Sequence, residues 1–315
     1  MTREETAKHL RWNAFLAMTR YELLWNIRKK KFLGMLVVAF VLATLGLFIP
    51  VILSNVMNEP LESNPKYVIE TGSGIGGFGF LLFAIVTAMN SISGEFESGS
   101  IVPLLTKPIS RTMVFLGKIV AGSLTLLVTY IMLMIYMTVG GTIIYGTQNN
   151  LHLLPLSLLG SLISTFVWIA IVLALGALSK SSMIAALGTI GTWMGANIVT
   201  GIVSVVTEQA WILNYVAGSG APGFVRDIGS QFPGTTYIMK AISTGTDAIA
   251  ANLVNYALYP SVDVEFYKGF IGFEEPLYTE ALGFILLRSI LVALVYICVF
   301  SFIAWYAFKR AEIKE

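Results

Sequence analysis

The residues that could carry out chemistry are few in this chain of 315 residues. It has two histidines, His9 and His152, and one cysteine, Cys298, which cannot form a histidine-based zinc site or a disulfide framework. It contains no Gly-x-x-x-x-Gly-Lys-Ser/Thr sequence, the loop that cradles nucleotide phosphates. We therefore expect no catalytic residue, metal or cofactor in the chain itself, and no enzymatic activity of its own.

The charged residues instead form one distinctive segment, residues 95–118 (EFESGSIVPLLTKPISRTMVFLGK), which we call the island. Residues 71–94 before it and residues 119–179 after it carry no Asp, Glu, Lys or Arg. A polar segment between two membrane spans lies at the membrane surface, where it cannot join a buried core. The island is therefore placed to contact a partner.

The sequence of the island predicts its local structure. Ile101, Leu104 and Leu105 can form the apolar face of a short helix. Pro108 ends that helix, because proline lacks the N–H group that the helix needs. Ser110 can then cap the next helix. We expect a short surface helix, an elbow and a long spanning helix, so that a force on the surface helix reaches the membrane directly.

Composition defines the class of protein. Hydrophobic residues make up 56% of the chain and charged residues 12%, well outside the range of soluble proteins. Apolar runs of about 20 residues predict membrane-spanning helices. A break at residues 146–150, followed by Pro155, divides the longest run into a hairpin. We predict an all-α polytopic membrane protein with six spans: 33–53, 73–92, 120–144, 154–177, 184–206 and 285–307.

The basic residues predict the orientation. If both termini are cytoplasmic, fifteen Lys and Arg residues lie inside and five outside, as the positive-inside rule requires. Residues 1–31 then form a helix on the inner membrane surface, and residues 308–315 form a cytoplasmic tail. The predicted location is the cell membrane. A net charge of only +2 argues against a nucleic-acid partner.

Residues 207–280 are predicted to form an external cap packed on the bundle. Within the cap, residues 235–256 could form a helix and residues 262–275 a short irregular segment. That helix could dip into the membrane, to a depth that Lys240 and Asp247 would limit.

The predicted spans contain few ionisable residues and many glycines. Arg288, near the outer end of the last span, is expected to reach the surface or to pair externally. No acid lies within a span, which argues against a proton- or sodium-coupled carrier. Glycines cluster in the second and fifth spans, where they permit close helix packing within a subunit or between subunits.

The island resembles the permease subunits of ATP-binding-cassette (ABC) transporters of the type-2 exporter superfamily. The resemblance rests on three ordered sequences: Glu97-Ser98-Gly99-Ser100-Ile101, Leu104-Leu105-Thr106-Lys107-Pro108-Ile109-Ser110-Arg111, and Gly117-Lys118. Ser98 stands where many relatives carry a basic residue. Six spans, a basic N-terminal helix and a large loop before the last span extend the resemblance over the chain.

The resemblance implies a permease dimer, expected to be a homodimer, that binds two separate ATPase subunits. ATP and magnesium would be bound by those subunits. The resemblance places the ATPase contacts on the island, as a coupling helix, and on the connection between spans four and five: Glu95, Glu97, Gly99, Ile101, Leu104, Leu105, Lys107, Pro108, Arg111 and Lys180. It places the transport pathway or dimer interface on spans two and five: Gly76, Met89, Asn90, Gly191, Trp193, Gly195 and Asn197.

The sequence thus predicts the transmembrane subunit of an ATP-driven exporter. Two alternatives remain open at this point. One is a secondary transporter or channel that works without an ATPase, and the other is a membrane scaffold for metalloenzyme maturation. The sequence does not identify the substrate.

Overall fold

The computed structural model describes residues 3–28, 31–58, 60–61, 63–72, 76–99, 110–207, 210–226, 239–267 and 277–310. These residues are mostly helical, and six of their helical segments are long and apolar enough to cross a membrane. Each of the six predicted spans overlaps one of them. The segments are Leu33–Met57, Gly76–Glu97, Arg111–Tyr145, Leu151–Ser179, Ser182–Thr207 and Leu282–Arg310.

Five of the six segments contain one long helix each: α2 (Lys31–Met57), α7 (Arg111–Tyr145), α8 (Leu154–Ser179), α9 (Ser182–Thr207) and α11 (Leu282–Arg310). The second segment is broken. Its first part is α4 (Gly76–Ala88), and after a turn it continues as the short helix α5 (Ser93–Glu97). The hydroxyl of Ser93 donates to the backbone carbonyl of Met89 across that turn.

The predicted hairpin between the third and fourth spans is confirmed. Residues 146–150 connect α7 to the single turn η1 (Leu151–Leu153) and to α8. Gly146 and Asn150 have φ angles of +86° and +58°, in the region that glycine and asparagine tolerate best. The short helix α3 (Tyr67–Thr71) packs beside this hairpin, where the rings of Tyr67 and Tyr145 stack at 3.9 Å.

The central helix of the bundle is α8, which contacts α4, α9, α10 and α11. In the 18-residue stretch that marks each span as apolar, 67% of the residues are buried for the span that contains α8, against 6% for α9. The core contains Trp168, Tyr130 and Phe83, whose side chains are fully buried. The hydroxyls of Tyr130 and Thr165 lie 2.5 Å apart and join α7 to α8.

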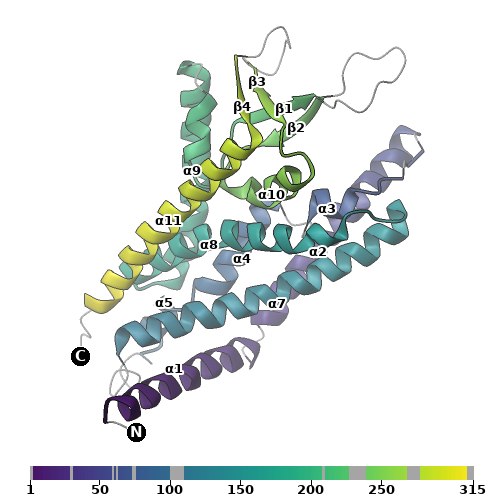
Figure 1. Cartoon of the computed structure of the whole chain (residues 1–315). Helices are drawn as coiled ribbons and strands as arrows, with labels where there is room; N and C mark the ends of the chain where they lie inside the picture. The colour runs from purple at the N-terminus through teal and green to yellow at the C-terminus, as the bar shows by residue number, and fades with distance from the viewer. Residues whose placement is uncertain are drawn as a thin grey trace.

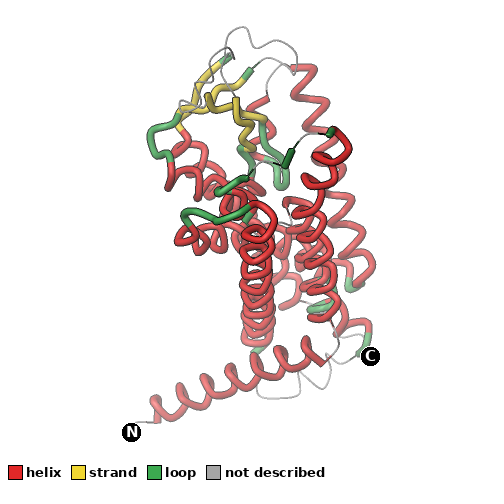
Figure 2. Tube along the Cα trace, turned by 90° about the vertical axis from the view of Figure 1, so that its right-hand side faces the viewer, coloured by secondary structure: helices red, strands yellow, loops and turns green. Residues whose placement is uncertain are grey.

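The N-terminal helix α1 (Arg3–Arg28) lies across one end of the long helices, and the strands gather at the opposite end (Figure 2). We call these the α1 end and the sheet end. Helix α1 packs against α7, where Gly117 leaves room for the side chain of Met18. Met18 is buried, whereas Trp12 and Leu16 of the same helix are exposed.

The cap, residues 207–280, contains a four-stranded antiparallel sheet that the sequence did not predict. Its strands lie in the order β2-β1-β3-β4, and β4 leads directly into α11 (Figure 1). The other elements of the cap are a helical turn η2, a second turn η3 and the helix α10. The bounds are η2 (Ala210–Tyr215), β1 (Pro222–Arg226), β2 (Met239–Ser243), η3 (Thr246–Ala248), α10 (Ile249–Leu258), β3 (Asp263–Phe266) and β4 (Tyr278–Ala281).

Two predictions for the cap are corrected by this sheet. The predicted helix over residues 235–256 is wrong for residues 239–243, because β2 pairs with β1 along its whole length, and the long helix begins only at Ile249. The segment 262–275, predicted to be irregular, contains β3. Arg288 is buried and pairs with an acid outside its own helix, its guanidinium lying 2.8 Å from Glu280 of β4.

The cap is inserted into the bundle along one face of α8. Gly160 allows the backbone of α10 to approach closely, since a Cβ atom at this position would lie 2.6 Å from the amide nitrogen of Ala250. One turn further along α8, the hydroxyl of Ser164 donates to the carbonyl of Thr246 at 2.7 Å. Ser164 is completely buried, so this bond anchors η3 inside the bundle.

Candidate functional site

The short helix α5 at the α1 end connects several spans, and its surroundings form the candidate functional site. Its five residues, 93–97, follow directly on α4 and include the first two acids of the island. We use the name junction for α5 together with Glu22, Lys118 and Ser182, the residues with which its side chains interact. The junction joins elements that lie far apart in the sequence.

A buried group of three charges links α5 to α1 and α7. The ammonium group of Lys118 lies 2.6 Å from Oε1 of Glu95 and 2.7 Å from Oε1 of Glu22. The side chains of Lys118, Glu22 and Glu95 are 4%, 9% and 15% exposed. Charges buried to this degree are stable only when they are paired, so the group fixes α1, α5 and α7 relative to one another.

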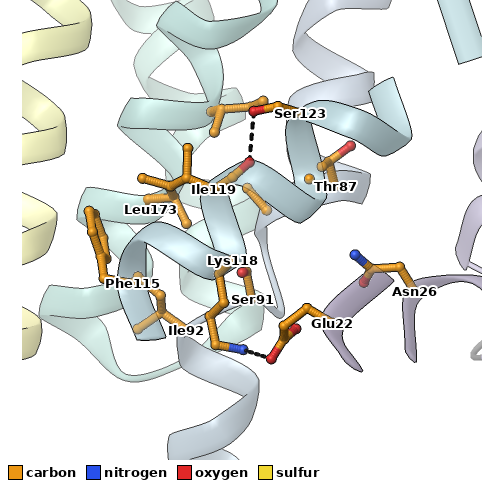
Figure 3. A pocket seen from close by; sticks show the side chains of 13 residues that line it. Glu22, Asn26, Thr87, Ser91, Ile92, Phe115, Lys118, Ile119, Ser123 and Leu173 are labelled. Atoms are coloured by element: carbon orange, nitrogen blue, oxygen red, sulfur yellow. Dashed lines mark hydrogen bonds and ion pairs between the residues drawn. The ribbon is translucent and has the colours of Figure 1, made fainter. Parts of the chain in front are cut away.

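A small cavity adjoins the ion pair of Lys118 and Glu22. Figure 3 shows Lys118 and Glu22 at its lower edge, with Asn26, Thr87 and Ser123 around it. Its volume of about 20 Å³ is enough for a single water molecule and too small for a transported substrate.

The second acid of α5 caps the fifth span. Glu97 accepts hydrogen bonds from the backbone N–H of Ser182 at 2.6 Å and from the Ser182 hydroxyl at 2.7 Å. Ser182 is the first residue of α9, where unpaired N–H groups and the helix dipole favour a carboxylate. The hydroxyls of Ser93 and Ser182 also lie 3.1 Å apart. A movement of α5 would therefore be transmitted to α9.

Further contacts connect the same region to the last span. The guanidinium of Arg111, in the first turn of α7, donates to the carbonyl of Lys309 near the end of α11 at 2.9 Å. The ring of Phe96 packs edge-on against Phe308 and lies 5.5 Å from the ammonium of Lys180. Lys180 ends α8 with a left-handed backbone, φ +56°. Arg111, Phe96 and Lys180 thus connect α5, α7, α8 and α11.

The structure describes part of the island that was predicted to contact an ATPase. Glu95 and Glu97 lie in α5, Lys180 lies over the ring of Phe96 of α5, and Arg111 contacts the end of α11. Gly99 follows α5 with a positive φ of +67°. Ser110 caps α7 as predicted, because its hydroxyl accepts from the N–H of Met113 at 3.2 Å. The remaining predicted residues lie outside the described part of the chain: Ile101, Leu104, Leu105, Lys107 and Pro108.

Sequence reasoning missed the partner of Lys118. Lys118 ends the island, and the structure buries it between two acids. Glu22 lies more than ninety residues earlier in the sequence, and only the packing of α1 on α7 brings it close. The available signal was the position of Lys118 at the edge of a long uncharged run, where a buried lysine needs a carboxylate partner.

The structure places the predicted pathway residues on α4, on the turn that follows it and on α9. Gly76 begins α4, whereas Met89 and Asn90 lie in the turn between α4 and α5. Trp193 of α9 packs on Phe78 of α4, with ring centroids 5.5 Å apart. The side-chain amide of Asn197 donates to the carbonyl of Trp193. The space beside two glycines of α9 is open, because a Cβ atom there would have no neighbour within 4 Å: Gly191 and Gly195.

The fold and this site define a class of membrane transport proteins. The sequence profile of the ABC-2 family transporter proteins matches residues 16–313, nearly the whole chain. The chain therefore belongs to the ABC-2 transporter family and is a multi-pass membrane protein. Comparison with individual curated proteins gave no match.

Proposed function

We propose that this chain is the transmembrane subunit of an ATP-driven exporter, coupled to separate ATPase subunits at the junction. Membership of the ABC-2 family supports a transport role. The proposed orientation places both termini and the junction in the cytoplasm and the cap outside, because fifteen of twenty basic residues then lie inside. The proposed location is the cell membrane.

The observation that carries this proposal is the double hydrogen bond between Glu97 and Ser182. It joins the end of span two to the start of span five, and these are the two spans proposed to line the pathway. Glu95 connects the same short helix to Lys118 at the start of span three. A displacement of the island by an ATPase would therefore reach spans two, three and five together.

The proposed working unit contains two copies of this chain. Of the six spans, α9 has the smallest share of buried residues in its apolar stretch, 6%. Its glycines Gly191 and Gly195 form a G-x-x-x-G pattern with open space beside them, a pattern that permits close helix contact. In Figure 1, α9 and α2 lie on opposite sides of the bundle, so a second copy can cover α9 without contacting α2. The rest of the apolar surface would face lipid.

Substitutions at the junction test the proposal. The chain should copurify with an ATPase that carries phosphate-loop and signature motifs and is encoded beside it. We expect Glu97→Gln and Arg111→Gln to lower ATPase association or substrate-stimulated hydrolysis several-fold while membrane insertion is unchanged. Asp263→Asn, a carboxylate-to-amide change in the cap, is the matched control and should leave both unchanged.

The same experiment must also distinguish the proposed exporter from a second candidate, a carrier that works without an ATPase. An ATPase-independent carrier would require ionisable groups in the bundle, and the sequence shows no acid within a span. The cap changes this argument because it inserts Asp247 beside Trp168 of α8. Transport by the purified chain without any ATPase, together with unimpaired function of the Glu97 and Arg111 variants, would overturn the coupled mechanism.

A further inference from the structure

A cavity of about 330 Å³ lies between the cap and the bundle, well separated from the junction. Its walls come from α2, α3, α4, α8, η3 and α10. Apolar and aromatic side chains, Tyr67, Ile69 and Phe80, form part of its surface. Glu70 and Thr71 line it as well and are exposed, so the cavity opens at α3.

Asp247 is the notable residue of this cavity. Its hydrogen-bond partners are neutral groups, the indole N–H of Trp168 at a long 3.4 Å and Thr246, and no described Lys or Arg forms an ion pair with it. Trp168 lies near the middle of the 26-residue α8, so the carboxyl group is level with the middle of a spanning helix. A carboxylate at this depth is costly unless something compensates its charge.

A serine hydroxyl in the α8 wall of the cavity also lacks a hydrogen-bond partner. Ser161 lines the cavity and is only 1% exposed, yet its hydroxyl makes no hydrogen bond to any residue in the described ranges. Ser161, Ser164 and Trp168 are spaced along one face of α8, the face that meets the cap. Ser161 and Asp247 therefore line the same cavity.

We propose that this cavity binds a small protonated organic amine. The ammonium group donates its N–H bonds to the carboxylate of Asp247 and to the hydroxyl of Ser161, and its charge compensates that of Asp247. The hydrocarbon part of the amine lies against Phe80, Ile69 and the α10 wall.

The chemistry of the walls favours an organic cation over a bare metal ion. A metal ion needs a shell of several oxygen ligands at short distance. The described residues contain no cluster of three or more His, Cys, Asp or Glu side chains that could hold one. The cavity instead combines a single buried carboxylate and serine hydroxyls with a large apolar surface, which suits an amine that has a hydrocarbon chain.

The direct test is equilibrium binding of radiolabelled n-butylammonium to the full chain in phosphatidylcholine nanodiscs at pH 8. Neutral lipid avoids adsorption of the cation, and empty nanodiscs give the background. We expect saturable binding that butan-1-ol and sodium ions do not displace. Displacement by butan-1-ol at similar concentration would show apolar partitioning, and displacement by sodium would show an inorganic cation site; either result overturns the proposal.

Two substitutions locate the bound amine. Asp247→Asn keeps the shape of the side chain and removes its charge, so affinity should fall at least tenfold. Ser161→Ala should weaken binding several-fold, which keeps the proposal testable if Asp247→Asn fails to fold. Asp263→Asn, exposed on β3, is the matched control and should bind as the wild type does. Wild-type affinity in Asp247→Asn, or in Ser161→Ala alone, would contradict the assignment.

The proposal is independent of the coupling mechanism. Binding is measured on this chain alone, without ATPase subunits or nucleotide. Loss of amine binding would leave the junction and its ATPase contacts untouched, and a failure of ATPase association would leave the cavity untouched. The two conclusions therefore fail separately.

Discussion

The junction and the cap cavity both contain acids removed from bulk solvent, and the two regions differ in whether a positive charge lies beside the acid. At the junction, Lys118 pairs with two carboxylates within 2.7 Å. In the cavity, Asp247 has no charged partner among the described residues, and its hydrogen-bond partners are neutral: the indole N–H of Trp168, at a long 3.4 Å, and Thr246. At the junction the chain itself supplies a counter-charge, whereas in the cavity no described residue supplies one to Asp247.

This difference indicates different roles. A buried, paired charge group resists separation, because each partner loses its compensation when the other moves away. It suits a connection that must transmit movement from α5 to α1 and α7. An uncompensated acid in a cavity suits reversible binding, because a ligand can supply the missing charge. The two regions should therefore respond differently to the removal of a single charge.

The largest effect is expected at the junction. Lys118→Met leaves Glu22 and Glu95 buried without a counter-charge, so the free energy of unfolding should fall by about 3–5 kcal/mol. Thermal unfolding of the detergent-solubilised protein measures this change. Adding Glu22→Gln and Glu95→Gln to Lys118→Met should restore much of the loss. A Lys118→Met variant as stable as the wild type would show that the charge group does not hold the junction together.

The insertion of the cap should show a smaller effect at Gly160. Gly160→Ala places a methyl group against the backbone of α10 and should destabilise the protein by about 1–3 kcal/mol. Gly191→Ala is the matched control, because no atom lies near its Cβ position within the subunit. Thermal unfolding of the monomer should therefore hardly change in Gly191→Ala. Equal effects at the two glycines would contradict the packing of α10 on α8.

The pH dependence of stability gives a further test of the cavity. Burial raises the pKa of Asp247 from its usual value to about 7. A folded-state pKa above the unfolded value means that the stability contribution is present at low pH and is lost as the pH rises through about 7. The free energy of unfolding should thus decrease between about pH 4 and pH 7, by at most about 1.4 kcal/mol per pH unit.

Comparison with Asp247→Asn isolates this contribution. Glu70 and Tyr67 line the same cavity, and burial raises the pKa of Tyr67 far above this pH range. The other titratable groups are the same in both proteins, so the difference between wild type and variant reports on Asp247. We expect the midpoint temperature of the wild type to fall relative to Asp247→Asn as pH rises. Parallel curves would show that Asp247 is not desolvated.

Much of the membrane architecture could be predicted from the sequence, because it depends on local composition. Apolar runs located all six spans, and the polar residues 146–150 located the hairpin. Ser110 was correctly predicted to cap α7, since capping depends on residues within one turn. The pairing of Arg288 outside the last span was also confirmed.

The features that were missed depend on contacts between distant parts of the chain. The strands of the cap are four or five residues long, and β1 and β3 pair Phe224 with Glu265 across some forty intervening residues. The pairing of Lys118 with Glu22 likewise needs α1 to pack on α7. The prediction that no acid lies within a span describes the bundle incompletely, because Asp247 of the cap lies beside Trp168 of α8.

The most direct test of the central claim is photocrosslinking from the island in the assembled complex. A photoreactive amino acid at Lys107 should crosslink to an ATPase subunit, and one at Lys180 should do so more weakly. The same group at Asp263, in the cap, should give no such product. Crosslinks from Asp263 but not from Lys107, or an ATPase-free protein that transports at full rate, would contradict the account.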